Sequence, residues 1–187
     1  GSVIHAFKDE QDIRNMGGVR KKLPYTYVLM LIGTLALTGF PFLSGFYSKD
    51  AIIEFAYLRN SSLGNYAATI GIFTAFLTSI YSWRLIFKTF HGSYNNSKFS
   101  ISETHESPFI MIGPLLILAA GAIFSGYFFK EIFIGHHSNE FWQSSIFFLE
   151  EIKHDPIPLW FLILTPMLVV ISIPISYYYF ILNTKIL

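Results

Sequence analysis

The sequence contains no cysteine, and only 13% of its 187 residues are charged. Without cysteine, the chain can form no disulfide, thiolate nucleophile or cysteine-ligated metal centre. The formal net charge of +1 is nearly neutral, and no tract rich in Lys and Arg suggests nucleic-acid binding. Soluble domains usually carry about 25% charged residues, so the shortage of charge favours a membrane protein.

Apolar residues dominate the chain: 52% are hydrophobic, 18% are aromatic and the mean hydropathy is +0.48. A membrane-spanning helix needs roughly 20 mostly apolar residues. Four segments meet this requirement, at 24–57, 66–90, 109–134 and 158–182. The sequence therefore predicts an all-α fold, a multi-pass transmembrane helical bundle in which residues 1–187 form a single transmembrane region.

Polar connections separate these segments, at 8–22, 59–65, 91–108 and 130–158. We expect residues 135–157 to be an extramembrane loop. Within it, Phe141, Trp142, Ile146 and Leu149 recur at helical spacing. This pattern predicts a short helix over 139–152 that lies in the membrane interface, with Trp142 at headgroup depth.

The distribution of Lys and Arg predicts the orientation of the chain, because they concentrate on the cytoplasmic or matrix side of short loops. We call the end of the bundle that carries the first connection side X. Nine cations fall on side X: Lys8, Arg14, Arg20, Lys21, Lys22, Arg84, Lys88, Lys98 and Lys185. Three fall on the other side: Arg59, Lys130 and Lys153. Side X is therefore expected to face the cytoplasm or matrix.

The first apolar segment is too long for one straight span. A continuous helix over 24–57 would measure about 50 Å, against roughly 30 Å of hydrocarbon. Gly39 permits non-helical backbone angles, and Pro41 removes a donor and disfavours helix at Phe40. The sequence predicts a discontinuous helix broken near Gly39–Pro41, a device that transporters use at ion sites.

Lys49 follows this break by about two turns, within the second half-helix. A charged side chain there costs at least about 2.5–3.5 kcal/mol, so it needs a partner, a hydrated cavity or a function. Asp50 and Glu54 share a helix face, whereas Lys49 points about 100° away from Asp50. The residues alone leave two interpretations open: Lys49 is a proton-transfer site, or it is a snorkelling anchor or salt-bridge partner.

The six histidines do not predict a metal site. His136 and His137 are adjacent rather than four residues apart, and the sequence has no HExxH motif. His5 precedes the first connection, where it is either packed or hydrogen-bonded, or a proton relay alongside Lys49.

The first connection holds a charged cluster of Glu10, Asp12 and Arg14. Two interpretations apply equally to these side chains. They either pair with neighbouring subunits or form an ordinary solvated loop.

Several stretches resemble the largest antiporter-like subunit of respiratory complex I, called chain 5 in mitochondria and chain L in bacteria. The family's loop motif, broken helix, SKD motif and aromatic/Arg helix end occur here in the same order. The matching stretches are GSVIHAFKDEQDIRNMGG (1–18), LIGTLALTGFPFLSGFYSKDAIIE (31–54), FLTSIYSWRLIFKTFHG (76–92) and ESPFIMIGPLLILAAGAIFSGYF (106–128).

This resemblance implies an internal fragment from the C-terminal half of that subunit, covering about helices 11 to 15. The implied activity is proton translocation driven by electron transfer from NADH to quinone, a translocase activity that the fragment alone is not expected to show. Lys49 takes the family's proton-transfer position, Asp50 is a supporting residue in the same motif, and His5 is a weaker candidate.

The resemblance also implies the surroundings of the chain. We expect a multi-pass protein of the bacterial cytoplasmic membrane or the mitochondrial inner membrane. Its partners would be the lipid bilayer and other membrane-arm subunits of complex I, with no nucleic acid. No cofactor is expected on this chain, and NADH, FMN, iron–sulfur clusters and quinone would be bound by other subunits.

Two alternatives stay open at this point. The first is the large subunit of a multi-subunit Na⁺/H⁺ antiporter, which resembles the chain in the same helices. The second is a structural membrane subunit with an inert Lys49, which holds partners together without conducting protons.

Overall fold

The computed structural model of the protein describes residues 1–95, 101, 104–135, 137–143, 145 and 157–183. These residues are helical or lie in turns and loops, and none of them forms a strand. The predicted all-α fold is therefore confirmed for the described part of the chain. The helices are α1 (Ser2–Ala6), α2 (Pro24–Thr38), α3 (Ser44–Leu58), α4 (Ser62–Phe90), α5 (Phe109–Phe133), α6 (Ser138–Trp142) and α7 (Leu159–Tyr177).

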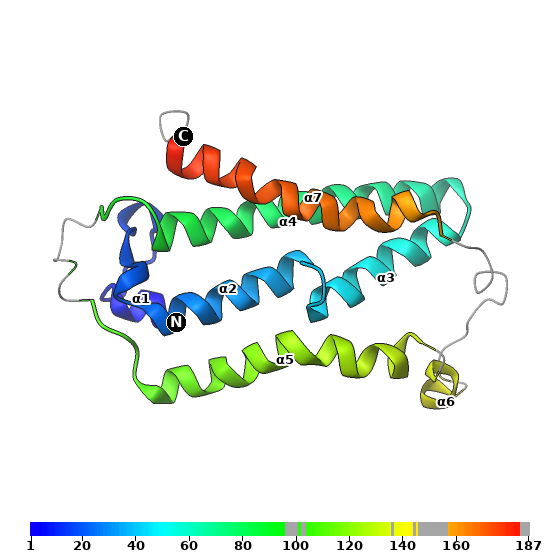
Figure 1. The fold of residues 1–187 in the computed structure, drawn as a ribbon, viewed down its shortest axis with the longest axis horizontal. Helices are drawn as coiled ribbons and strands as arrows, with labels where there is room; N and C mark the ends of the chain where they lie inside the picture. The colour runs from blue at the N-terminus through cyan, green and yellow to red at the C-terminus, as the bar shows by residue number, and fades with distance from the viewer. Residues whose placement is uncertain (96–100, 102–103, 136, 144, 146–156, 184–187) are drawn as a thin grey trace.

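The helices form an elongated bundle in three layers (Figure 1). Helices α2 and α3 follow one another through the middle layer, with α5 on one side and α4 and α7 on the other. Both α2 and α3 contact α4 and α5. The broken helix is thus enclosed by neighbouring helices, which is the condition for non-helical backbone at membrane depth.

Among the described residues, three helices are long and apolar enough to cross a membrane: Ser62–Phe90, Phe109–Phe133 and Leu159–Leu182. The last combines α7 with a π-helical turn over Tyr178–Leu182. Three of the four predicted segments are therefore continuous helices, and the fourth is the α2–α3 pair. Helix α4 begins at Ser62 rather than residue 66, because the hydroxyl of Ser61 accepts a hydrogen bond from the Gly64 N–H at 3.0 Å.

A buried aromatic cluster closes side X of the bundle. It joins α1, the loop between α1 and α2, and the ends of α4 and the π-helical turn. We call this cluster the side X core; its members are Ala6, Phe7, Met16, Val19, Leu23, Trp83, Ile86, Phe87, Phe90 and Phe180. The hydrophobic effect therefore docks the first loop onto the helix ends.

Helices α4 and α7 run in the same direction (Figure 1) and meet through buried hydroxyls. Ser79 Oγ and Ser172 Oγ lie 2.5 Å apart, and the Ser172 hydroxyl also donates to the Val169 carbonyl at 2.7 Å. Both serines are fully buried. Small hydroxyl side chains of this kind let membrane helices approach closely and hydrogen-bond across the interface.

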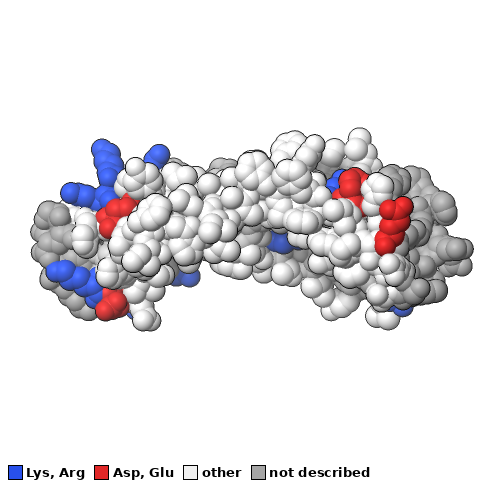
Figure 2. All heavy atoms as spheres, turned by 90° about the horizontal axis from the view of Figure 1, so that it is seen from below, with Lys and Arg blue, Asp and Glu red and all other residues white. Residues whose placement is uncertain are grey.

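Charged side chains gather near the two ends of the molecule, and the long middle section is mostly uncharged (Figure 2). Seven of the nine cations assigned to side X are described there, and Arg59 and Lys130 lie at the other end. Lys98, Lys153 and Lys185 fall outside the described residues. The orientation of side X in the membrane stays a prediction.

Helix α5 ends at Phe133, within one residue of the predicted segment 109–134, so the predicted polar connection 130–158 begins too early. Lys130, where the two predictions overlap, lies in the last turn of α5. Helix α6 then packs back onto this helix end, where Trp142 Nε1 donates to the Phe133 carbonyl at 3.0 Å. The helix predicted over 139–152 is described only at its start, because residues 144 and 146–152 lie outside the described part; the interfacial helix stays a prediction.

Candidate functional site

The predicted break lies between α2 and α3, where residues 39–43 form the junction. Gly39 has φ +81°, the left-handed conformation that ends a helix. Its N–H donates to the Ala36 carbonyl at 3.2 Å, and the Phe40 N–H donates to the Leu35 carbonyl at 3.0 Å. This pair of hydrogen bonds is a Schellman motif, so the sequence Gly39-Phe40-Pro41 terminates α2 as expected.

Helix α3 begins in direct backbone contact with the last turn of α2. A Cβ atom at Gly45 would lie 1.8 Å from the Ala36 carbonyl oxygen. No side chain fits in that space, so glycine is required for α3 to start this close to α2. The sequence analysis did not single out Gly45, because glycine identity alone does not reveal which backbone approaches it.

Lys49 reaches back from α3 to the end of α2. Its Nζ donates to the Leu37 carbonyl at 3.2 Å, one of the last carbonyls of α2, which have no partner within the helix. A cation at a helix C-terminus is stabilised by the helix dipole. Among the described residues, no ion pair joins Lys49 to Asp50 or Glu54. The partner of Lys49 is therefore a backbone carbonyl rather than a carboxylate.

Two carboxylates follow Lys49 on α3, and α5 brings a second lysine to the same helix. Asp50 and Glu54 are partly buried, and Lys130 is near enough to interact electrostatically with Glu54. Lys130 Nζ also lies 5.3 Å from the ring centroid of Tyr47, a cation–π contact. Sequence reasoning missed this group, although a lysine inside the last turn of an apolar span was an available signal.

Two cavities flank the end of α2, and Leu37 lines both of them. The first, of about 600 Å³, extends toward side X; its lining includes Ile4, Thr26, Met30, Ser82 and Leu118. The second, of about 550 Å³, extends toward the other end; its lining includes Ser44, Ser48, Ser125, Lys130 and Ile134. Leu37, whose carbonyl accepts from Lys49 Nζ, therefore lines both cavities, whereas Lys49 is not among the lining residues of either.

The structure does not bring His5 and Lys49 together. His5 is exposed on α1, beside the beginning of α2 (Figure 1), whereas Lys49 contacts its end. The 15 residues of α2, about 22 Å long at 1.5 Å per residue, lie between the two ends.

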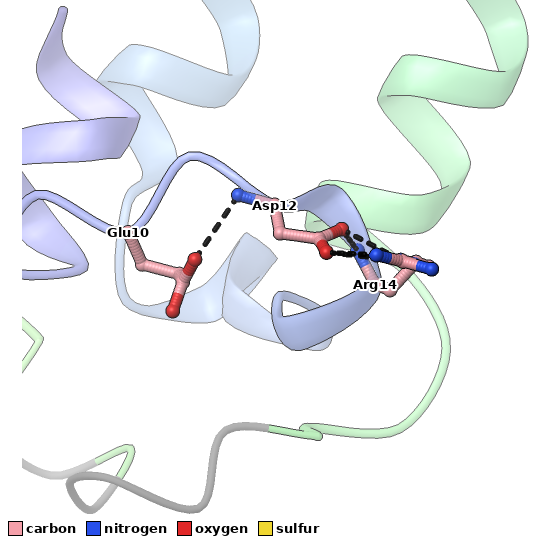
Figure 3. Close-up of polar contacts among 3 residues, drawn as sticks. All are labelled: Glu10, Asp12 and Arg14. Atoms are coloured by element: carbon pink, nitrogen blue, oxygen red, sulfur yellow. Dashed lines mark hydrogen bonds and ion pairs between the residues drawn. The ribbon is translucent and has the colours of Figure 1, made fainter.

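The charged cluster in the first loop is paired within itself (Figure 3). Arg14 donates from Nε and Nη2 to the Asp12 carboxylate at 2.6–3.0 Å, and the Asp12 N–H donates to Glu10 Oε1 at 3.1 Å. The hydrogen bonds from the Arg14 side chain and backbone lower the pKa of Asp12 from its usual 3.8 to about 2. Asp12 and Arg14 therefore satisfy one another without a neighbouring subunit.

Comparison of the sequence with known families places the chain in a class of membrane proteins. Residues 1–78 match the family model described as NADH:quinone oxidoreductase/Mrp antiporter, TM. Residues 81–139 match the family model described as NADH dehydrogenase subunit 5 C-terminus. The chain is thus an antiporter-like membrane protein, and within that class it belongs to the NADH dehydrogenase subunit 5 family. The resemblance noted from the sequence is confirmed.

Its curated relatives include proteins named NADH-ubiquinone oxidoreductase chain 5. The one from Marchantia polymorpha is 52% identical over 149 residues, which are 80% of this chain and 22% of the relative. The one from Chondrus crispus is 48% identical over 160 residues, or 83% of this chain and 24% of the relative. The one from Arabidopsis thaliana is 48% identical over 149 residues, which are 80% of this chain and 22% of the relative.

The chain thus spans about a fifth of the length of the curated relatives it matches. Its family, together with the three long apolar helices, identifies it as a multi-pass inner-membrane protein. The localisation expected from the sequence, a multi-pass protein of an inner membrane, is therefore confirmed.

Proposed function

We propose that the chain is part of the proton-translocating membrane arm of NADH:quinone oxidoreductase, and that Lys49 is a proton-transfer residue within it. The relatives' names support the enzyme, an oxidoreductase acting on NADH and ubiquinone. In this proposal the chain binds no cofactor of its own. Electron transfer through NADH, FMN, iron–sulfur clusters and quinone takes place in partner subunits, and its energy drives proton movement through this one.

The hydrogen bond from Lys49 to the Leu37 carbonyl carries this proposal. An ammonium group has three N–H donors, and the Leu37 carbonyl takes one of them. The other two are available to water or to neighbouring side chains. In this proposal Lys49, held by a neutral acceptor on a residue that lines both cavities, exchanges protons with water and side chains near them.

Asp50 is a supporting residue in the proposal. It lies next to Lys49 on α3 and is partly buried, and no ion pair joins the two among the described residues. Its carboxylate therefore affects Lys49 through the local field rather than by direct contact. His5 is a weaker candidate, because it can exchange protons with Lys49 only through groups or water along α2.

Among the two alternatives, the family matches favour complex I over the Na⁺/H⁺ antiporter. The model matched by residues 1–78 names both systems. The model matched by residues 81–139 names NADH dehydrogenase alone, and the relatives are named NADH-ubiquinone oxidoreductase chain 5. The other alternative, a structural subunit with an inert Lys49, is distinguished from the proposed proton-transfer role by the following experiment.

The decisive variant is Lys49→Ala in the intact protein within its native membrane. We expect the complex to assemble normally and the rate of proton pumping to fall by roughly tenfold or more, since a lost proton-transfer group typically costs 10²–10⁴ in rate. Assembly is measured by native gel electrophoresis, NADH oxidation by absorbance, and pumping by quenching of a pH-sensitive dye in sealed vesicles.

Lys88→Ala is the matched control, because Lys88 is also a helical lysine but lies near the side X end of α4. We expect it to pump normally. Normal pumping and normal NADH oxidation in an assembled Lys49→Ala complex would overturn the assignment and favour the structural subunit.

A further inference from the structure

The beginning of α2 lacks a local cap. Pro24 occupies the first helical position and Leu23, at the N-cap, provides no capping side chain. The next N–H groups, those of Tyr25 and Thr26, have no acceptor within the helix. Such donors require partners from elsewhere when a helix end is covered by protein.

Glu106 supplies these partners from far along the chain. Its carboxylate accepts from the Tyr25 N–H at 3.0 Å and from the Thr26 N–H at 3.3 Å, and it also accepts a short hydrogen bond from the Thr26 hydroxyl. Glu106 lies just before α5 and is separated from α2 by 80 residues. The segment that leads into α5 therefore holds the start of α2.

The two ends of α2 are thus bound by opposite charges. The carboxylate of Glu106 lies at the N-terminus of α2, and the ammonium of Lys49 lies at its C-terminus. A helix dipole is positive at its N-terminus and negative at its C-terminus, so both charges are favourably placed. Glu106 lies in the segment before α5, and Lys49 lies on α3. Helix α2 therefore contacts both of these elements, one at each of its ends.

We propose that Glu106 is a positioning residue for Lys49. By binding the N–H groups at the start of α2, Glu106 fixes α2 along its axis and keeps the Leu37 carbonyl within reach of Lys49 Nζ. The cavity that Leu37 shares with Thr26 runs along the same helix, so axial movement of α2 alters its lining at both ends. An effect of Glu106 on proton transfer rests on the proposed function of Lys49. An effect of Glu106 on the position of α2 does not.

Two accepting oxygens and a negative charge distinguish Glu106 from an ordinary capping side chain. Oε2 accepts from the Tyr25 N–H, and Oε1 accepts from the Thr26 N–H and hydroxyl. A glutamine at position 106 keeps one accepting oxygen, places an NH₂ donor where the other oxygen was, and loses the charge that interacts with the dipole. An aspartate keeps both oxygens and the charge with a shorter reach, so a positioning role predicts that aspartate restores more than glutamine does.

The position of α2 can be measured without proton transport, because the chain has no cysteine. Leu37→Cys introduces the single thiol of residues 1–187 while keeping the backbone carbonyl that binds Lys49. The intact complex in native membranes is treated with a methanethiosulfonate reagent, and modification is followed by the mass of the peptide that contains residue 37. The rate is compared among Glu106, Glu106→Gln, Glu106→Asp and Glu106→Ala, each with Leu37→Cys.

We expect Glu106→Gln and Glu106→Ala to change the labelling rate by about two- to fivefold, and Glu106→Asp to restore part of it. Glu131→Gln is the matched control, since Glu131 is an exposed carboxylate near the other end of α5, and it should leave the rate unchanged. Thr26→Val provides a second test that keeps the charge and the backbone donors; we expect a smaller change of the same sign.

Equal labelling rates in Glu106, Glu106→Gln and Thr26→Val would overturn the positioning role. That result would leave the role of Lys49 untouched, because the labelling does not depend on pumping. Conversely, a changed labelling rate together with normal pumping in Lys49→Ala would support the positioning role and overturn the proton-transfer assignment.

Discussion

The side X core and the α2–α3 junction are stabilised by different interactions. The side X core is built from buried apolar side chains such as Phe7, Leu23 and Phe90, whose exposure is 0–1%. The junction is not closed by such a core, and its Phe42 is 80% exposed. Its order depends on backbone hydrogen bonds, one close glycine contact and one lysine. Packing fixes the end of the bundle, whereas directional contacts fix the candidate site.

The largest loss of stability is expected from a truncation in the side X core. Phe90→Ala removes a side chain that is 1% exposed and leaves a cavity, which typically costs about 3–5 kcal/mol. Phe73→Ala, on the same helix α4 but 61% exposed, is the matched control and should cost far less. Thermal or denaturant unfolding in detergent measures both. Similar losses for the two variants would contradict a core concentrated at side X.

A smaller but more local effect is expected at the junction. Gly45→Ala places a Cβ 1.8 Å from the Ala36 carbonyl oxygen, so α3 must move away, at a cost of about 1–3 kcal/mol. Hydrogen exchange should rise at the start of α3 and at the end of α2. Gly121→Ala is the control, because a Cβ at Gly121 meets nothing within 4 Å; alanine there should be neutral or slightly stabilising. Equal effects of the two variants would contradict the close contact.

The smallest effect is expected from the ion pair in the first loop. The pKa of Asp12 is lowered to about 2, so its contribution to stability is complete above about pH 4 and is lost as pH falls toward 2. Arg14 has a side chain that is 82% exposed, and exposed pairs of this kind contribute little. Asp12→Asn should therefore leave the unfolding midpoint unchanged between pH 5 and 8. A clear shift in that range would mean that the loop, as well as the core, holds side X.

Much of the fold was predictable because apolar length and helix-breaking residues act locally. The four segments, the break at Gly39–Pro41 and the place of Lys49 on the second half-helix all follow from such local signals. The predicted start of α4 was wrong by one turn. Ser61, whose hydroxyl caps the helix, lies in the segment that was predicted to be a polar connection.

The contacts of the site were not predictable, because they join distant residues. The Leu37 carbonyl as partner of Lys49, the close approach at Gly45 and the reach of Glu106 to α2 each depend on how helices are packed. No spacing rule within one helix encodes them. The same holds for Lys130, whose position against Tyr47 appears only when α5 lies beside α3.

The junction makes chain length part of the site. Lys49 is carried by α3 but bound by α2, and only residues 39–43 lie between these helices. One residue inserted or deleted there would change where α3 begins relative to α2 and move Lys49 away from the Leu37 carbonyl, with Lys49 and Leu37 both still present. A change in the number of residues at this point should therefore be tolerated less than a change in their identity.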